Sequence, residues 1–94
     1  MKLEYDEQKS IKNTLERGLP FSLVQNFEFD TAFIKQDLRN EYSEIRYQAL
    51  GLIENRLYAL VFCLRNGAVR VISFRKANSR EIIIYEKNRQ SDNR

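Results

Sequence analysis

The spacing of apolar positions alternates along this 94-residue chain between a helical period and a strand period. In residues 7–17, Ile11 and Leu15 lie four apart, which is the spacing of neighbours on one face of a helix. Asp6 stands just before this segment as an N-cap residue, and Gly18 follows it as a typical helix stop. The pattern therefore predicts a first helix over residues 7–17.

Shorter apolar runs predict two further helices and five strands. Residues 21–27 read as a short helix with Phe21, Val24 and Phe27 along one side. Residues 57–64 are apolar on both faces, which is typical of a central strand covered on both sides. The other expected elements are strands at 2–5, 31–38, 45–53 and 68–75 and a final helix at 79–89.

Two local signals fix the ends of these elements. Asn66-Gly67 between two apolar runs favours a type I′ hairpin, because both residues tolerate a positive φ. Asn78 and Glu81 stand at the first and fourth positions of a capping box, which marks the start of the final helix. Both signals lie in the second half of the chain, where we expect consecutive strands.

The element order β-α-α-β-β-β-β-α, with short connections between strands, predicts an α+β fold with a mostly antiparallel sheet. Strands 45–53, 57–64 and 68–75 should form its meander. The length suits a single domain, which we place at residues 1–90, and the polar residues 91–94 read as a frayed tail.

Composition narrows the chemistry. The chain has no histidine, which excludes Ser-His-Asp and Cys-His catalysis and removes the commonest metal ligand, so we expect neither a metal nor another cofactor. The single cysteine, Cys63, lies in an apolar run and reads as a buried, inert thiol. No apolar run approaches the ~20 residues that span a bilayer, and the N-terminus shows no apolar signal region, so we expect a cytoplasmic protein with no membrane partner.

Charge is distributed unevenly. Residues 1–55 hold seven Lys/Arg and ten Asp/Glu, whereas residues 56–94 hold nine and three. A basic half favours an anionic partner such as nucleic acid, and the alternative is a solvated surface.

Several arginines lie on or beside predicted strands. A charged side chain on a core strand is unusual and calls for an explanation. Simple alternation places Arg75 on the opposite face of its strand from Arg70. We hypothesise that Arg46, Arg65 and Arg75 form a concave basic face that grips a phosphate, because the guanidinium fork binds two phosphate oxygens. Solvated or salt-bridged charges are the alternative.

Taken together, these segments resemble the BrnT family of toxins. The opening LEYDEQKSIKN is similar to the family's F-x-W-D-x-x-K-x-x-x-N, and SEIRYQALG to its E-x-R-x-x-x-x-G. LYALVFCLRNG resembles a strand ending in x-R-x-G, and VRVISFRKANSREIIIYE resembles R-I-I-S-x-R-x-A-x-x-x-E-x-x-x-Y. ERGLPF takes the place of K-H-G-V-S-F, so that Arg17 stands where the family commonly has histidine. The matched positions are Tyr5, Asp6, Lys9, Asn13, Gly18, Phe21, Phe27, Glu44, Arg46, Gly51, Arg65, Arg70, Ser73, Arg75, Ala77, Glu81 and Tyr85.

The resemblance implies a RelE-like fold and the activity of a type II toxin: metal-independent cleavage of RNA (mRNA), neutralised by a BrnA-like antitoxin. It also implies a 2:2 toxin–antitoxin complex whose contact with operator DNA is made mainly by the antitoxin.

Metal-free cleavage by the ribose 2′-OH needs a proton acceptor, cations on the phosphorane and a proton donor. By position in the family pattern, the resemblance favours Glu44 as acceptor and Arg65 and Arg75 as catalytic cations. Lys9 is a proton-donor candidate, and each of these residues has a plain surface role as its alternative. The candidate RNA-phosphate ligands are Arg17, Arg46, Arg70 and Arg80. Tyr47 and Tyr58 stack on bases or, alternatively, pack in the core.

Two rival functions stay open. The first is a toxin-like module that binds RNA or antitoxin without cleaving, since an arginine in place of histidine is a poor proton donor or acceptor near neutral pH. The second is a small α+β domain with a structural role and no nucleic-acid chemistry.

Overall fold

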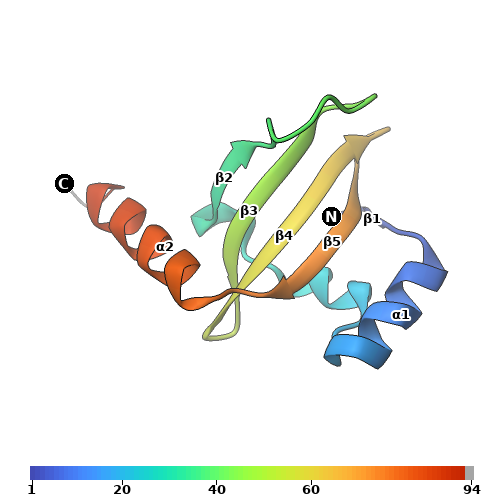
Figure 1. The fold of residues 1–94 in the computed structure, drawn as a ribbon, viewed down its shortest axis with the longest axis horizontal. Coiled ribbons are helices and arrows are strands. Elements are labelled where there is room, and N and C mark those ends of the chain that lie inside the picture. The colour runs from blue at the N-terminus through green and yellow to red at the C-terminus, as the bar shows by residue number, and fades with distance from the viewer. Residues whose placement is uncertain (93–94) are drawn as a thin grey trace.

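A five-stranded sheet forms the centre of the molecule, in the order β1-β5-β4-β3-β2 (Figure 1). The computed structural model describes residues 1–92 and the side chains of residues 1–89. Only β1 and β5 pair in parallel, so the prediction of an α+β fold with a mostly antiparallel sheet is confirmed. The strands are β1 (Leu3–Glu4), β2 (Phe33–Gln36), β3 (Arg46–Ile53), β4 (Arg56–Arg65) and β5 (Ala68–Lys76).

Three helices lie between β1 and β2 in the chain, and a fourth follows β5 within the described residues. They are α1 (Glu7–Arg17), the 3₁₀ helices η1 (Phe21–Asn26) and η2 (Phe29–Thr31), and α2 (Ser79–Asp92). The predicted second helix is thus a 3₁₀ helix. The predicted strand 31–38 is shorter at both ends, because η2 takes in residue 31 and β2 ends at Gln36. α2 runs past its predicted end at residue 89 and takes in two residues of the expected tail, and residues 93–94 lie outside the described residues. None of the helices in the described range is long and apolar enough to cross a membrane.

The local signals for turns and caps are confirmed. Asp6 accepts hydrogen bonds from the backbone N–H groups of Gln8 and Lys9, and Gly18 ends α1 with a φ of 70°. Asn66 and Gly67, with φ of 51° and 78°, make the turn between β4 and β5. These positive φ values are those that a type I′ turn requires.

The hydrophobic core lies on one face of the sheet, beneath η1. Phe21, Val24 and Phe27 are all buried there against Leu60 and Phe74, as their predicted common face implies. Val24 and Phe74 are 0% and 1% exposed. η1 therefore covers the core face of β4 and β5.

α1 packs with its polar side inward. Its buried residues are Ser10 and Asn13, while Ile11 and Leu15 are 51% and 82% exposed. Ser10 Oγ accepts from the backbone N–H of Phe21, and Asn13 Nδ2 donates to two buried carbonyls. Ile11 and Leu15 therefore indicate the helix correctly, but they do not lie on the face of α1 that packs against the rest of the protein.

A β-bulge in β5 decides which way its arginines point. Val61 of β4 pairs with Ser73 and Phe62 pairs with Val71, so Ile72 is left as the extra residue. Arg70 then pairs with Cys63, on the same face of the sheet as Arg75. The prediction that Arg70 and Arg75 lie on opposite faces is wrong, because simple alternation does not allow for the inserted residue.

α2 leaves the end of β5 and points away from the sheet (Figure 1). Its start is a capping box: Glu81 N–H donates to Asn78 Oδ1, and Asn78 N–H donates to Glu81 Oε1. Ile82 and Ile83 are exposed, whereas Tyr85 is buried. α2 thus places its buried Tyr85 beside Leu52 and Leu57, on the sheet face opposite to the core.

Candidate functional site

Side chains on the sheet face opposite to the core are arranged in cross-strand rows. One row carries Phe33, Leu50, Ala59 and Arg75. The next carries Lys35, Gln48, Val61 and Ser73. A third carries Arg46, Cys63, Arg70 and Glu4. Because paired residues point to the same side, these rows define one continuous surface across the sheet.

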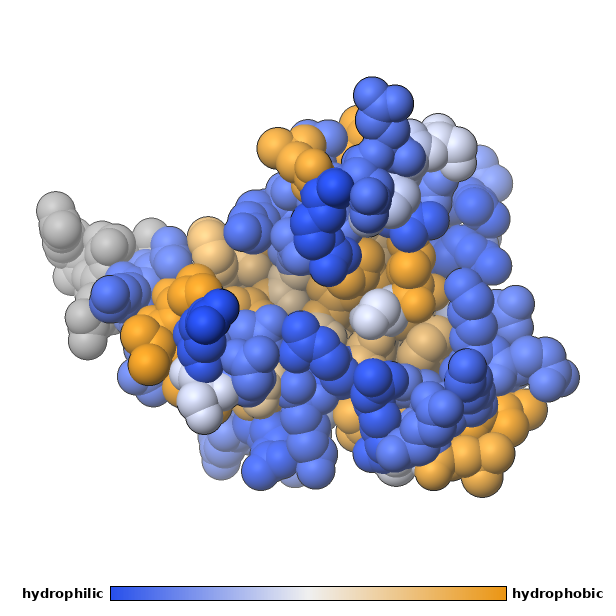
Figure 2. Space-filling view, viewed as in Figure 1, coloured by the Kyte–Doolittle hydropathy of each residue, from blue (hydrophilic) through white to orange (hydrophobic). Residues whose placement is uncertain are grey.

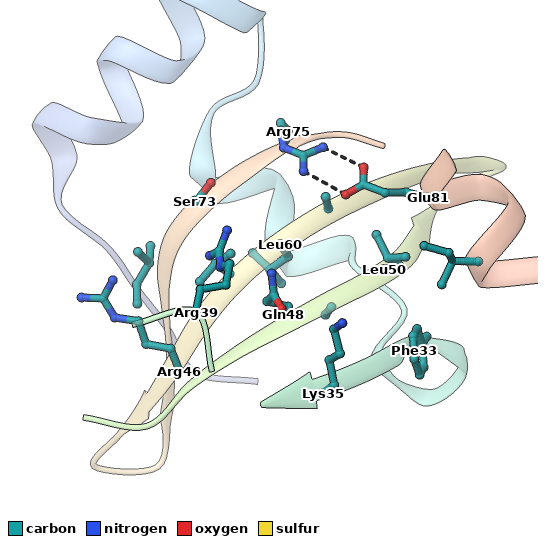
Figure 3. A pocket seen from close by; sticks show the side chains of 15 residues that line it. Phe33, Lys35, Arg39, Arg46, Gln48, Leu50, Leu60, Ser73, Arg75 and Glu81 are labelled. Atoms are coloured by element: carbon teal, nitrogen blue, oxygen red, sulfur yellow. Dashed lines mark hydrogen bonds and ion pairs between the residues drawn. The ribbon is translucent and has the colours of Figure 1, made fainter. Parts of the chain in front are cut away.

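A hollow of about 240 Å³ lies over the first two rows. Figure 2 shows it as a depression with apolar surface at its bottom and hydrophilic residues around it. Four of its lining residues are cationic: Lys35, Arg39, Arg46 and Arg75 (Figure 3). β4 was predicted as a central strand covered on both sides; it is central, but here it lies under the open hollow.

Glu81 fixes Arg75 at one side of the hollow. Arg75 donates from Nη1 to Oε1 at 2.8 Å and from Nη2 to Oε2 at 2.9 Å (Figure 3). These bonds lower the pKa of Glu81 and raise that of Arg75, each against the opposing effect of burial. The start of α2 and the end of β5 are thereby joined at the hollow.

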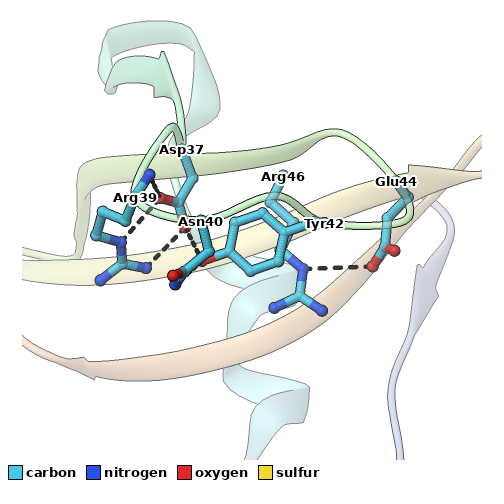
Figure 4. A network of polar contacts seen from close by, with 6 residues as sticks. All are labelled: Asp37, Arg39, Asn40, Tyr42, Glu44 and Arg46. Atoms are coloured by element: carbon cyan, nitrogen blue, oxygen red, sulfur yellow. Dashed lines mark hydrogen bonds and ion pairs between the residues drawn. The ribbon is translucent and has the colours of Figure 1, made fainter.

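The segment after β2 brings a second arginine over the sheet. The side chain of Asp37 is fully buried and accepts from Arg39 Nε at 2.8 Å and Nη2 at 2.7 Å (Figure 4). The backbone N–H of Arg39 and the hydroxyl of Tyr42 donate to the same carboxylate. The pKa of Asp37 is held well below its usual range, and the hydrogen bond from the Arg39 side chain is the largest cause. This network sets the direction of Arg39.

Arg46 completes the cationic group. Its Nε donates to Glu44 Oε1 at 3.3 Å, and its guanidinium carbon lies 4.1 Å from the centre of the Tyr42 ring (Figure 4). Within the described residues, Nη1 and Nη2 of Arg46 make no hydrogen bond, and Nη1 of Arg39 makes none. An anion can therefore bind the two terminal nitrogens of Arg46 as a fork, and it can also accept a hydrogen bond from Nη1 of Arg39.

Charges of one sign converge at this site. Arg75 has its pKa raised by Glu81 and, in the opposite sense, lowered by the nearby charge of Arg39. Arg39 and Arg75 both line the hollow, so the two positive charges share one concave surface. An anion between them would relieve their repulsion, which favours phosphate or carboxylate as a ligand.

The predicted catalytic cations are not brought together. Arg75 lines the hollow, whereas Arg65 lies on the same face but outside it. Arg75 pairs with Ala59, six residues along β4 from Arg65, a separation of about 20 Å. Arg65 instead neighbours Glu44, whose pKa it helps to lower.

Glu44 stands beside the hollow rather than in its lining. It accepts from Ser43 Oγ at 2.7 Å and from Arg46. The Ser43 hydrogen bond is the main cause that lowers its pKa, and Arg46 and Arg65 add to it. In this state the carboxylate is a weaker proton acceptor than an ordinary glutamate.

The other predicted ligands lie elsewhere. Lys9 and Arg17 are exposed on α1, which packs beside η1, and Arg17 donates to Asn13. Arg70 pairs with Glu4 at 3.2 Å, and Arg80 is exposed at the start of α2. None of these four lines the hollow.

The two tyrosines belong to the core. Tyr47 stacks on Phe62 and Tyr58 stacks on Phe74, and both pack against the buried cluster under η1. Tyr47 and Tyr58 were predicted either to stack on RNA bases or to pack in the core, and the structure shows that they pack in the core.

Sequence reasoning missed Lys35, Arg39 and Asp37 as site residues. The alternation of β2 was the available signal for Lys35, which pairs with Gln48 on the open face. In the sequence, Asp37 and Arg39 look like two ordinary charges of a polar loop. Their role depends on the path of the chain, which turns back over the sheet and places Arg39 in the lining of the hollow. Within residues 1–92, no three His, Cys, Asp or Glu side chains come together as a metal site.

Comparison with known proteins gives one match. A family model described as the ribonuclease toxin BrnT of type II toxin–antitoxin systems matches residues 5–81. The matched range includes every residue that lines the hollow except Ile84. No curated protein and no solved structure gave a significant match.

Proposed function

Since the chain belongs to the BrnT family of ribonuclease toxins of type II toxin–antitoxin systems, we propose that it is a metal-independent endoribonuclease that cleaves mRNA at the hollow. The observation that carries the proposal is the convergence of Arg39, Arg46 and Arg75 on one concave surface. A phosphodiester is the anion in RNA that such a group of guanidinium ions binds.

In this proposal the scissile phosphate binds to the terminal nitrogens of Arg46 and Arg39. Nη1 and Nη2 of Arg46 and Nη1 of Arg39 have no partner among the described residues, so they can bind the phosphate without breaking an existing ion pair. Arg75, held in place by Glu81, faces the same space and stabilises negative charge as the phosphorane forms. Arg65 and Arg70, on the same face outside the hollow, bind neighbouring phosphates of the strand.

Glu44 is the proposed acceptor of the 2′-OH proton. The negative charge of a phosphate bound to Arg46 opposes the effect of the arginines that help to lower the pKa of Glu44, and so makes this carboxylate a better proton acceptor. The proton-donor role considered for Lys9 passes to Lys35, whose side chain lines the hollow. The 2′ oxygen attacks the adjacent phosphorus, the bond to the 5′ oxygen breaks, and a 2′,3′-cyclic phosphate and a 5′-hydroxyl remain.

The family also supports an antitoxin partner. We propose that this partner is BrnA-like, that the complex is 2:2 and cytoplasmic, and that the antitoxin makes most of the contact with operator DNA.

A second candidate is a module that binds RNA or antitoxin without cleaving it. It is favoured by the carboxylates of the site, because Asp37, Glu44 and Glu81 all have lowered pKa values and are poor proton acceptors in the free protein. Cleavage separates the two candidates.

The test is incubation of purified protein with RNA in EDTA, followed by analysis of the new ends. We expect 2′,3′-cyclic phosphate and 5′-hydroxyl ends, and loss of cleavage in Arg46→Ala. The matched control is Arg56→Ala, which removes the same charge from an exposed position at the start of β4. Intact RNA with retained binding would leave the non-cleaving module, and intact RNA without binding would remove both candidates.

A further inference from the structure

The middle row of the open face places two polar side chains on either side of a small apolar one. Gln48 of β3 and Ser73 of β5 both pair with Val61 of β4. With strands about 4.8 Å apart, their Cα atoms are about 10 Å apart. Neither side chain makes a hydrogen bond within the described residues, and both line the hollow (Figure 3).

Beneath them, β4 offers a floor without long side chains. Its residues on this face are Ala59, Val61 and Cys63, between Leu57 at one end and Arg65 at the other. Figure 2 shows the corresponding apolar surface at the bottom of the hollow. A flat group can therefore lie directly on the middle strand.

The hollow is large enough to take such a group. Its volume of about 240 Å³ is many times the ~10–15 Å³ that a single water molecule needs. The flat ring system of one nucleobase therefore has room on this floor.

We propose that the hollow takes one unstacked base of single-stranded RNA and that Gln48 is the specificity-determining residue that reads it. The base lies on Ala59 and Val61, and the Gln48 amide, with one acceptor and two donors, bonds to its edge. This inference rests on the proposed function and names the part of the substrate that the site selects.

Charge favours a nucleotide over an apolar peptide as the occupant. Lys35, Arg39 and Arg46 border the floor, so a base that enters the hollow carries its phosphate to the available nitrogens of Arg39 and Arg46. A neutral apolar side chain would fill the floor but leave these cations without an anion.

The test is fluorescence anisotropy with five short single-stranded RNAs: four homopolymers and one strand of abasic sugars, with RNA integrity checked afterwards. We expect the wild type to bind at least one homopolymer about fivefold or more tighter than the abasic strand. Gln48→Leu, which keeps the size of the side chain but removes its polar atoms, should bring the four homopolymers to within about twofold of one another. Its affinity for the abasic strand should stay within twofold of the wild type, which a misfolded variant would not show.

Gln8→Leu is the matched control, because it makes the same substitution at an exposed position of α1 outside the hollow, and it should keep the order of base preference. Gln48→Glu, which can only accept, should change that order. Equal binding of all five strands by the wild type, or an unchanged preference in Gln48→Leu, overturns the base site while leaving the phosphate site intact. Absence of binding to every strand overturns the proposed function as well.

Discussion

Arg75 on β5 and Glu81 in the first turn of α2 form an ion pair of two hydrogen bonds, and the same carboxylate caps the helix. Glu81 Oε1 accepts from the backbone N–H of Asn78 at 3.0 Å while it binds Arg75. We predict that Glu81→Ala lowers the free energy of unfolding by about 1–2 kcal/mol, because it removes the capping box together with the ion pair. Urea unfolding measures the loss.

Glu86→Ala is the control for this prediction. Glu86 is exposed on the same helix, and its replacement should change the free energy of unfolding by less than about 0.5 kcal/mol. Equal effects of the two substitutions would show that Glu81 does not join α2 to β5.

The buried polar face of α1 gives a second prediction. Asn13 Nδ2 donates to the carbonyl of Leu19 at 2.8 Å and to that of Phe74 at 2.9 Å. Asn13→Ala leaves both buried carbonyls without the hydrogen bond from the amide. It should lower the free energy of unfolding by about 1–3 kcal/mol. Leu15→Ala, on the exposed face of the same helix, should cost less than about 0.5 kcal/mol. A larger loss from Leu15→Ala than from Asn13→Ala in thermal or urea unfolding would contradict this packing.

Much of the fold follows from local rules that act on few residues. Asn66-Gly67, the Asn78 and Glu81 pair, and Gly18 each specify a backbone conformation by themselves, and the structure has all three. α1 shows the limit of periodicity, since its apolar residues face outward and its polar ones bind backbone groups of distant segments. Hydrophobic spacing identified the helix but could not identify its partner.

The site depends on two features that alternation does not reveal. The extra residue at Ile72 turns Arg70 to the side of Arg75, and a bulge has no composition signal as clear as that of a turn. The return of the chain after Asp37 brings Arg39 to the hollow, and that path depends on the pairing of Arg39 with a buried carboxylate rather than on a local preference. Sequence therefore indicated arginines on a sheet but not which of them converge.

Close packing at β3 gives a third prediction. Gly51 is buried, and a Cβ atom at this position would run into the ring of Phe27. Gly51→Ala should lower the free energy of unfolding by about 1–3 kcal/mol, because either the ring or the strand must shift. The ring is the cause, so Gly51→Ala should cost less in a Phe27→Leu background than in the wild type. A cost that is the same in both backgrounds in urea unfolding would show that the backbone freedom of glycine matters here instead of the ring.

The buried carboxylate of Asp37 predicts how stability depends on pH. Arg39 holds the pKa of Asp37 well below its usual range, so the unfolded chain binds a proton at higher pH than the folded one. The stability that this difference provides is fully present at neutral pH. It falls as the pH drops below the usual aspartate value of about 4 towards the folded value.

Asp37→Asn should therefore unfold more easily at pH 7, since the amide cannot pair with Arg39, and should show a shallower loss of stability on acidification. Urea midpoints measured from pH 7 to pH 2.5 check both effects. Asp30→Asn, at an exposed position in η2, is the control and should keep the wild-type slope. If the profiles of the wild type and Asp37→Asn run parallel, the Asp37–Arg39 pair does not set the acid limit. The buried position of Asp37 beneath the loop that carries Arg39 would then need another explanation.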